Sequence, residues 1–135
     1  MKYLVDVDVI SEATKPHPAP SVIDWLRNNE ADLVVDPVVL GEIRFGILLL
    51  PKGKRRAALE AWFDQGVRNM VCLSWDAETA LRWASLLASL RAKGAVMQLK
   101  DSMIAASALT HELVMVTRNV ADFKKAGVRV VNPFG

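Results

Sequence analysis

Short apolar runs alternate with segments of helical periodicity along the whole chain. The runs predict buried strands near residues 2–6, 32–35, 70–75, 113–116 and 128–131. Short buried strands that are separated by helices are typical of a parallel sheet covered on both faces. The pattern therefore predicts an α/β fold, a three-layer α/β/α sandwich with a mainly parallel central sheet, built by residues 1–135 as a single domain.

Three helices are expected in the first half of the chain, and capping signals set the starts of two of them. Ser21 is expected to be the N-cap of one helix, because a hydroxyl before an amphipathic run suits that position. Asp36 followed by Pro37 predicts a helix from Pro37 to about residue 50. Another helix is expected over residues 54–67.

In the second half, Asp76 and Gly94 mark the ends of the longest expected helix. Asp101 is expected to open the next helix, and residues 117–123 are expected to form a turn. The apolar stripe of the longest helix is predicted to contain Ala80, Leu81, Ala84, Leu87, Ala88 and Arg91.

Composition limits the class of protein. A chain of 135 residues with 52% hydrophobic and 24% charged residues is typical of one globular domain. No apolar run is long enough for a membrane span, and Asp6 stands too early for a signal peptide. The single cysteine, Cys72, excludes an internal disulfide framework and is expected to be a small core residue. A cytoplasmic location is expected.

The net charge of +2 conceals three basic clusters. Basic clusters around an acidic pocket would attract phosphate chains, although such runs can also be solvated helix ends and loops. The clusters are Lys52, Lys54, Arg55 and Arg56; Arg91, Lys93 and Lys100; and Lys124, Lys125 and Arg129.

Five acidic residues lie where apolar segments begin, end or turn inward: Asp6, Asp8, Glu42, Asp101 and Asp122. Carboxylates are rarely buried unless they are paired or bind a cation. The carboxyl ends of parallel strands meet at one edge of a sheet, where α/β proteins bind ligands. Several carboxylates at that edge predict a site for a hard divalent cation.

Four of the five acids also have an obvious structural interpretation, whereas Asp6, at the end of a buried strand, has none. The structural roles are an N-cap for Asp101, an N-cap for Asp8 with Glu12 on the same face, a turn for Asp122, and an ion pair with Arg44 or with an arginine elsewhere for Glu42.

Four motifs resemble those of one family in order and spacing. They are LVDVDVISE, LGEIRFGI, LKDSMIAASAL and VMVTRNVADF, followed by the ending Asn132-Pro133-Phe134. Together they are similar to PIN-domain ribonucleases of the VapC toxin type, in the FitB-like branch, over residues 2–134.

The resemblance implies a catalytic quartet of Asp6, Glu42, Asp101 and Asp122 that holds one or two Mg²⁺ or Mn²⁺ ions. Asp6 and Asp101 would be the main ligands, and Glu42 and Asp122 would bind directly or through water. The implied reaction is hydrolysis of RNA phosphodiester bonds by metal-activated water. Thr117 and Asn119 would position a ligand or a phosphate, and either Asn119 or Asp122 completes the quartet.

The chain departs from the family pattern at Val7, where threonine is usual, and at Asp8, where asparagine is usual. Asp8 therefore joins Thr117 and Asn119 as a supporting residue, and Asp8→Asn is expected to raise RNA cleavage at limiting metal.

The resemblance also implies partners: a VapB- or FitA-like antitoxin, RNA as substrate, promoter DNA only through the antitoxin, and a second copy of the chain as a homodimer. The apolar residues Ile10, Val22 and Trp25 are expected to face the antitoxin or the second copy.

Two other functions fit parts of the pattern. A phosphoacceptor receiver domain could use Asp36 as its acceptor, and a PIN-like scaffold could serve only to assemble a complex. Four tryptophans at amphipathic spacing are expected in the core or at an interface: Trp25, Trp62, Trp75 and Trp83.

Overall fold

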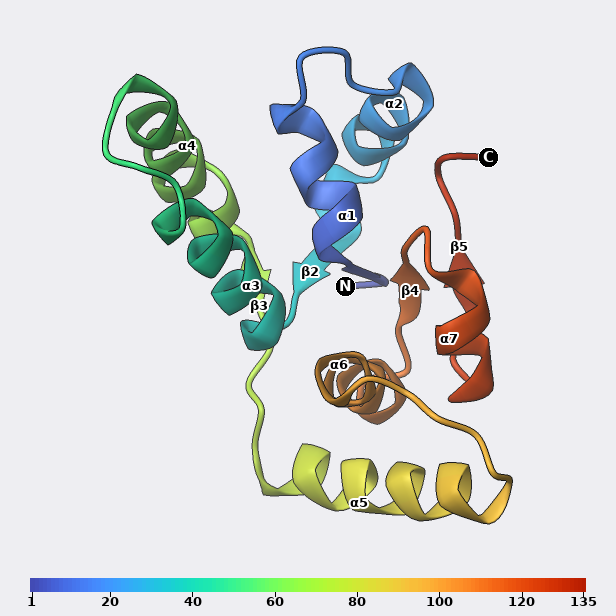
Figure 1. Ribbon diagram of the computed structural model, residues 1–135. Helices are drawn as coiled ribbons and strands as arrows, with labels where there is room; N and C mark the ends of the chain where they lie inside the picture. The colour runs from blue at the N-terminus through green and yellow to red at the C-terminus, as the bar shows by residue number, and fades with distance from the viewer.

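The computed structural model describes residues 1–135 and contains one five-stranded parallel sheet, as predicted (Figure 1). The strand order is β3-β2-β1-β4-β5 and all four pairings are parallel. The strands are β1 (Tyr3–Val5), β2 (Leu33–Val35), β3 (Val71–Cys72), β4 (Val114–Val116) and β5 (Val130–Val131).

Helices cover the sheet on both sides, which confirms the predicted three-layer α/β/α arrangement. In Figure 1, α6 lies below the sheet with α5 outside it, while α1 and α2 lie above. The helices are α1 (Val7–Ile10), α2 (Pro20–Asn28), α3 (Pro37–Leu48), α4 (Lys54–Gln65), α5 (Ala77–Ala92), α6 (Leu99–Thr110) and α7 (Val120–Lys125). Short 3-10 turns are η1 (Ser11–Thr14), η2 (Glu30–Asp32) and η3 (Val67–Asn69). No helix is long and apolar enough to cross a membrane.

Two of the predicted caps are present. The Asp36 carboxylate accepts a hydrogen bond from the Val38 amide at 2.8 Å, and that of Asp76 accepts one from the Thr79 amide at 3.1 Å. Gly94 follows α5 in the left-handed conformation (φ +68°), which glycine adopts without strain.

Three predictions about element boundaries are wrong. The helix α2 begins at Pro20 and has no side-chain cap, because Glu12 accepts the Ala19 amide at 2.8 Å in place of a Ser21 cap. Asp101 does not open α6, since Gln98 is the N-cap and Asp101 lies inside the first turn. Residues 117–123 are not only a turn, because α7 begins within them.

The predicted stripe of α5 is also wrong. Leu81 is exposed, and the residues of α5 that are buried are Thr79, Leu86 and Leu90. The helix packs against α6 along one side only, and large side chains on that side offer more apolar area than the alanines of the predicted stripe. Trp83 lies half-buried on α5 and forms an edge-to-face pair with Trp75, with ring centroids 5.9 Å apart.

The tryptophans pack as core or interface residues, as predicted. Trp25 and Trp62 pack against the main core, and the indole N–H groups of Trp75 and Trp83 donate to Met103 O and Ser102 Oγ of α6. These two bonds fix the first turns of α6 to α5 and its preceding loop.

The expected partner-facing and core roles of three other positions are corrected. Val22 is buried in the core of the chain itself and Trp25 packs against Tyr3, so neither is a free surface, whereas Ile10 lines an apolar groove beside α2. Cys72 is exposed, because it lies on β3 at the edge of the sheet, and it is therefore not a core residue.

Candidate active site at the carboxyl edge of the sheet

Asp6 lies at the end of β1, where the parallel pairing with β4 brings it beside Thr117. The Thr117 hydroxyl donates to Asp6 Oδ2 at 2.7 Å, and the Val7 amide donates to Asp6 Oδ1 at 2.8 Å. Asp6 is thus the N-cap of α1, a role that the sequence had assigned to Asp8. With both oxygens held and 6% of the residue exposed, the Asp6 carboxylate has one fixed orientation.

Burial raises the pKa of Asp6 from 3.8 to about 6. The hydrogen bonds from Thr117 and Val7 oppose this increase, while the negative charges of Asp8 and Asp101 add to it. The charged form of Asp6 therefore lacks a nearby positive charge, which is the situation that a bound cation would correct.

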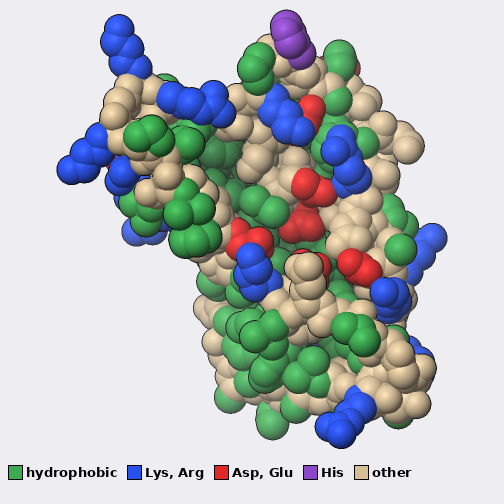
Figure 2. Space-filling model, in the orientation of Figure 1, with side chains coloured by type: hydrophobic (Ala, Val, Ile, Leu, Met, Phe, Trp, Pro, Cys, Tyr) green, Lys and Arg blue, Asp and Glu red, His purple; other side chains and the backbone are tan.

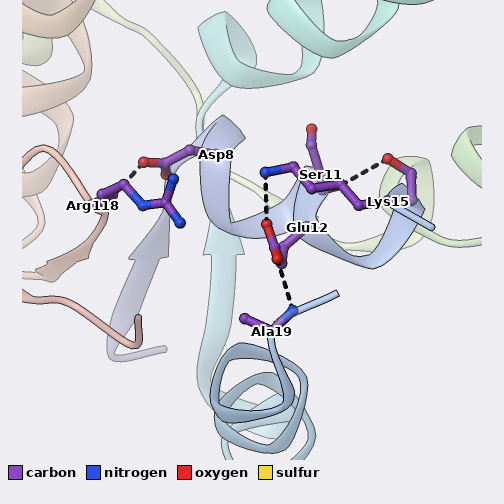
Figure 3. Close-up of polar contacts among 7 residues, drawn as sticks. Asp8, Ser11, Glu12, Lys15, Ala19 and Arg118 are labelled. Carbon is purple, nitrogen blue, oxygen red and sulfur yellow. Dashed lines mark hydrogen bonds and ion pairs between the residues drawn. The ribbon is translucent and has the colours of Figure 1, made fainter. Parts of the chain in front are cut away.

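Asp8 lies in the first turn of α1 and contacts the loop after β4. Its Oδ2 accepts the Arg118 backbone amide at 3.0 Å (Figure 3). The Arg118 guanidinium stacks 3.7 Å from the centroid of the Phe134 ring. Asp8 Oδ1 is buried and has no hydrogen-bond partner. Burial raises the pKa of Asp8.

Glu12 does not belong to this group. Its carboxylate pairs with Lys15 at 2.9 Å and accepts the Ala19 amide, so that it holds the segment before α2 (Figure 3). The hydrogen bond from Ala19 lowers the pKa of Glu12.

Glu42 points from α3 toward the start of α6, and its side chain is 20% exposed. Its Oε2 lies 3.3 Å from Lys100 Nζ, while its Oε1 is buried without a partner. The expected ion pair with Arg44 is wrong, because Arg44 reaches Asp64 at 3.9 Å instead.

Asp101 is half-buried, and no hydrogen bond or ion pair engages its carboxylate. Burial raises the pKa of Asp101, and the negative charges of Glu42 and Asp122 raise it further. Asp101 thus faces the other acids with only the nearby Lys100 charge to offset them.

Asn119 and Asp122 have distinct positions, although the sequence left open which of them completes the acidic site. Asn119 Nδ2 donates to Asp122 Oδ2 at 2.9 Å, and Lys125 Nζ lies 3.1 Å from Asp122 Oδ1. The pKa of Asp122 is lowered by the Asn119 bond first and then by Lys125. Asn119 is therefore the donor that orients the carboxylate, and its own backbone amide donates to Thr117 Oγ1 at 3.0 Å.

The acids gather at the centre of one face of the molecule, with lysine and arginine side chains directly around them (Figure 2). In this arrangement no three carboxylates converge closely enough to enclose a single ion. The donors nevertheless fit a hard cation, because all are oxygens and two buried carboxylate oxygens, on Asp8 and Glu42, lack any partner.

Sequence reasoning missed how Lys100, Lys125 and Arg118 contact the acids. The Lys125–Asp122 pair has helical (i, i+3) spacing and could have been found from the sequence. The Lys100–Glu42 pair joins residues 58 apart in the chain, and no local pattern predicts it.

Asp36 does not fit the receiver hypothesis. It is fully buried, its Oδ1 caps α3, and the Ser107 hydroxyl donates to its Oδ2. Burial raises the pKa of Asp36. A carboxylate with both oxygens occupied inside the core cannot serve as an accessible phosphoryl acceptor.

Comparison with known proteins gives one consistent result. Residues 3–128 match the PIN domain family. The chain is 34% identical to plasmid stability protein StbB of Pseudomonas syringae pv. tomato, with 97% of each chain covered. It is 30% identical to VapC ribonuclease Y4jK of Sinorhizobium fredii (97% and 96% covered) and 30% identical to toxin FitB of Neisseria gonorrhoeae (97% of each). Among solved structures, a chain of FitAB bound to an IR36 DNA fragment superimposes with a TM-score of 0.93 at 29% identity, covering 98% of this chain and 96% of that one.

Proposed function

Because this chain belongs to the PIN domain family, we propose that it is an endoribonuclease and the toxin of a toxin–antitoxin pair. The observation that carries the proposal is the group of carboxylates at the carboxyl edge of the sheet, two of which, Asp6 and Asp101, have raised pKa values and form no ion pair. The relatives named VapC ribonuclease and toxin FitB support the same activity.

We propose that the site works with Mg²⁺ or Mn²⁺. Asp6 and Asp101 would be the main ligands, with Glu42 and Asp122 bound directly or through water. A divalent ion there would lower the pKa of a water molecule and offset the charge that develops on the phosphate. The chain itself contributes orientation, since Thr117 fixes the Asp6 carboxylate and Asn119 fixes that of Asp122.

The direct test is cleavage of RNA by the purified chain with Mg²⁺ or Mn²⁺ and with a chelator. The proposal expects cleavage that needs the metal and is lost in Asp6→Asn and Asp101→Asn, but is retained in Asp24→Asn, an exposed carboxylate on α2. Cleavage that persists in the chelator, or equally in all variants, would reveal a contaminating nuclease. A pure chain that never cleaves RNA would favour the assembly scaffold instead.

We propose that an antitoxin similar to VapB or FitA binds this chain and carries any contact with promoter DNA. The related solved structure is of FitAB bound to an IR36 DNA fragment. This chain has an apolar groove of about 690 Å³ between α2 and the end of α4, with ten hydrophobic residues among its fifteen. Such a groove fits the apolar face of an antitoxin helix.

Replacing Val71 with glutamate is expected to weaken antitoxin binding at least about 10-fold, because a charge in an apolar contact loses its hydration. Val71 lines the groove and is 61% exposed, so the fold should tolerate the change. Titration calorimetry with the purified cognate antitoxin measures the effect. Leu81→Glu on α5 is the matched control, and equal affinities of the two variants would exclude the groove.

We propose that two copies associate through an apolar patch made by the exposed residues Phe45 and Leu48 of α3, Leu49 directly after it, and Leu99 of α6. Phe45 and Lys100 line the same hollow beside Glu42, so the patch adjoins the acidic site. This surface replaces the one that the sequence suggested around Ile10, Val22 and Trp25.

The double variant Phe45→Glu/Leu49→Glu is expected to be monomeric, because it places a charge on each copy at the centre of the contact. Light scattering coupled to size exclusion, at about 10 to 100 times the concentration used for cleavage, measures the mass. The exposed Leu81→Glu again serves as the control. A dimer that persists in the double variant would rule out this patch.

Asp8→Asn is expected to lower the KM for RNA about 3-fold at limiting metal, because an exposed charge pair is worth up to about 1 kcal/mol. The Asp8 charge lies near the Arg118 guanidinium, and asparagine would still accept the Arg118 amide. With less negative charge nearby, the Arg118 guanidinium would attract the phosphates of RNA more strongly. Steady-state kinetics across a magnesium titration provide the measurement, and an unchanged KM would show that Asp8 does not restrain Arg118.

A further inference from the structure

Two acids of the quartet already hold a lysine, and the other two hold none. Lys100 pairs with Glu42 at 3.3 Å and Lys125 with Asp122 at 3.1 Å. Figure 2 shows lysine and arginine side chains around the acidic group. The acids are therefore divided into a pair open to a cation and a pair that is already neutralised by the chain.

We infer that Lys100 is an internal counter-ion that competes with a divalent cation for the Glu42 carboxylate. The inference rests on the proposed function only in taking this site to bind a cation. It assigns to Lys100 the control of how tightly the site binds metal, separately from any role in cleavage.

The geometry makes the Lys100 contact exchangeable. The lysine side chain is 59% exposed, whereas that of Glu42 is 20% exposed. A lysine has a long flexible stem, and a pair with one exposed partner is readily displaced. Lys100 also satisfies only one oxygen of Glu42, since Oε1 stays buried without a partner. A cation that binds both oxygens would satisfy Glu42 more completely.

The position of Lys100 extends its effect beyond Glu42. It directly precedes Asp101 in the first turn of α6, and its positive charge opposes the increase in the pKa of Asp101. One ammonium group therefore relieves the repulsion between two carboxylates, which a dication must otherwise do. In the metal-free chain, the Lys100 charge therefore offsets part of the repulsion between these carboxylates.

Lys125 is less free to exchange. Its ammonium contacts Asp122 and also lies 3.5 Å from the carbonyl oxygen of Val96, while its own carbonyl accepts a hydrogen bond from Lys93 at 3.4 Å. These contacts tie Lys125 to the loop before α6. Lys100 has only the Glu42 contact, so it is the lysine that a cation displaces first.

The experiment measures Mn²⁺ binding to the full chain without RNA, by electron paramagnetic resonance or calorimetry. Lys100→Met is compared with Lys54→Met, which removes the same charge from an exposed site at the start of α4. We expect Lys100→Met to bind Mn²⁺ about 3- to 10-fold more tightly than the control. The difference should shrink as the salt concentration rises from about 0.05 to about 0.5 M, because salt screens exposed charges.

A double-mutant cycle identifies Glu42 as the partner. In a Glu42→Gln background, the gain of Lys100→Met over Lys54→Met should be clearly smaller than in the wild-type background, because the carboxylate for which the two cations compete is gone and only the effect of Lys100 on Asp101 remains. Equal affinities of the two lysine variants, a gain that is undiminished in Glu42→Gln, or a complete lack of Mn²⁺ binding would each overturn the inference. A chain that shows the expected shift but never cleaves RNA would overturn only the proposed nuclease function.

Discussion

Replacing Asp6 with asparagine is expected to lower the rate of RNA cleavage by at least about 1000-fold, because the substitution removes a main ligand of the proposed cation. The same substitution is expected to stabilise the metal-free chain by about 2 kcal/mol at about pH 8. Asparagine keeps the size of the side chain and can still accept the Val7 amide through its Oδ1. It removes a buried negative charge that no cation offsets in the metal-free chain.

The sign of the effect follows from proton binding. The Asp6 pKa is about 6 in the folded chain and close to 3.8 when the chain unfolds, so between these values the folded state binds more protons. The free energy of unfolding therefore falls as the pH rises through this window, and it stays low above it. A shift of this size corresponds to about 3 kcal/mol, of which the loss of the Thr117 hydrogen-bond acceptor in the variant offsets a part.

Thermal melting in a chelator between about pH 4 and pH 8 measures this prediction. The wild-type melting temperature should decline with rising pH more steeply than that of Asp6→Asn. Asp24→Asn, which changes an exposed carboxylate paired with Arg27, should follow the wild type. Parallel curves for wild type and Asp6→Asn would show that Asp6 is not the group that destabilises the metal-free fold.

Asp101→Asn is expected to reduce cleavage by at least about 1000-fold and Asp122→Asn by only about 10- to 100-fold. Asp101 has no partner in the chain and a raised pKa, so its charge is available to a cation. The Asp122 carboxylate already accepts hydrogen bonds from Asn119 and Lys125, and these contacts lower its pKa. We therefore expect Asp122 to bind the cation through water.

Single-turnover cleavage rates at saturating Mg²⁺ compare the two variants. The Mn²⁺ affinity of each variant then shows whether its loss of activity is caused by a loss of metal binding. Asn119→Asp serves as a second probe of α7, because it replaces the donor that orients Asp122 with a repelling carboxylate. Equal losses for Asp101→Asn and Asp122→Asn would mean that both are direct ligands, and a larger loss for Asp122→Asn would reverse their assignment.

The sequence predicts the strands and the acids at their ends because short apolar runs and capping aspartates are local signals. Asp36 caps α3 as predicted, and Asp6 follows β1 as predicted. The acids lie together in the structure, but their role as a metal site stays a prediction. The cytoplasmic location likewise stays a prediction.

The wrong predictions concern residues whose burial or contacts depend on packing against distant parts of the chain. The buried side of α5 depends on its contact with α6, and Cys72 is exposed because β3 is an edge strand, which its own sequence does not reveal. Ser21 does not cap α2, because the helix begins at Pro20 and the Glu12 carboxylate of η1 accepts the Ala19 amide just before it. The pairing of Lys100 with Glu42 depends on how α3 and α6 meet.

The bond between Asp6 and Thr117 joins residues 111 positions apart in the chain. Asp6 follows β1 in chain order, whereas Thr117 follows β4 and Asp122 lies in α7. During synthesis the contact between Asp6 and Thr117 therefore cannot form until β4 and residue 117 have emerged from the ribosome. The acidic site of the proposed nuclease is accordingly not assembled in the growing polypeptide before that point.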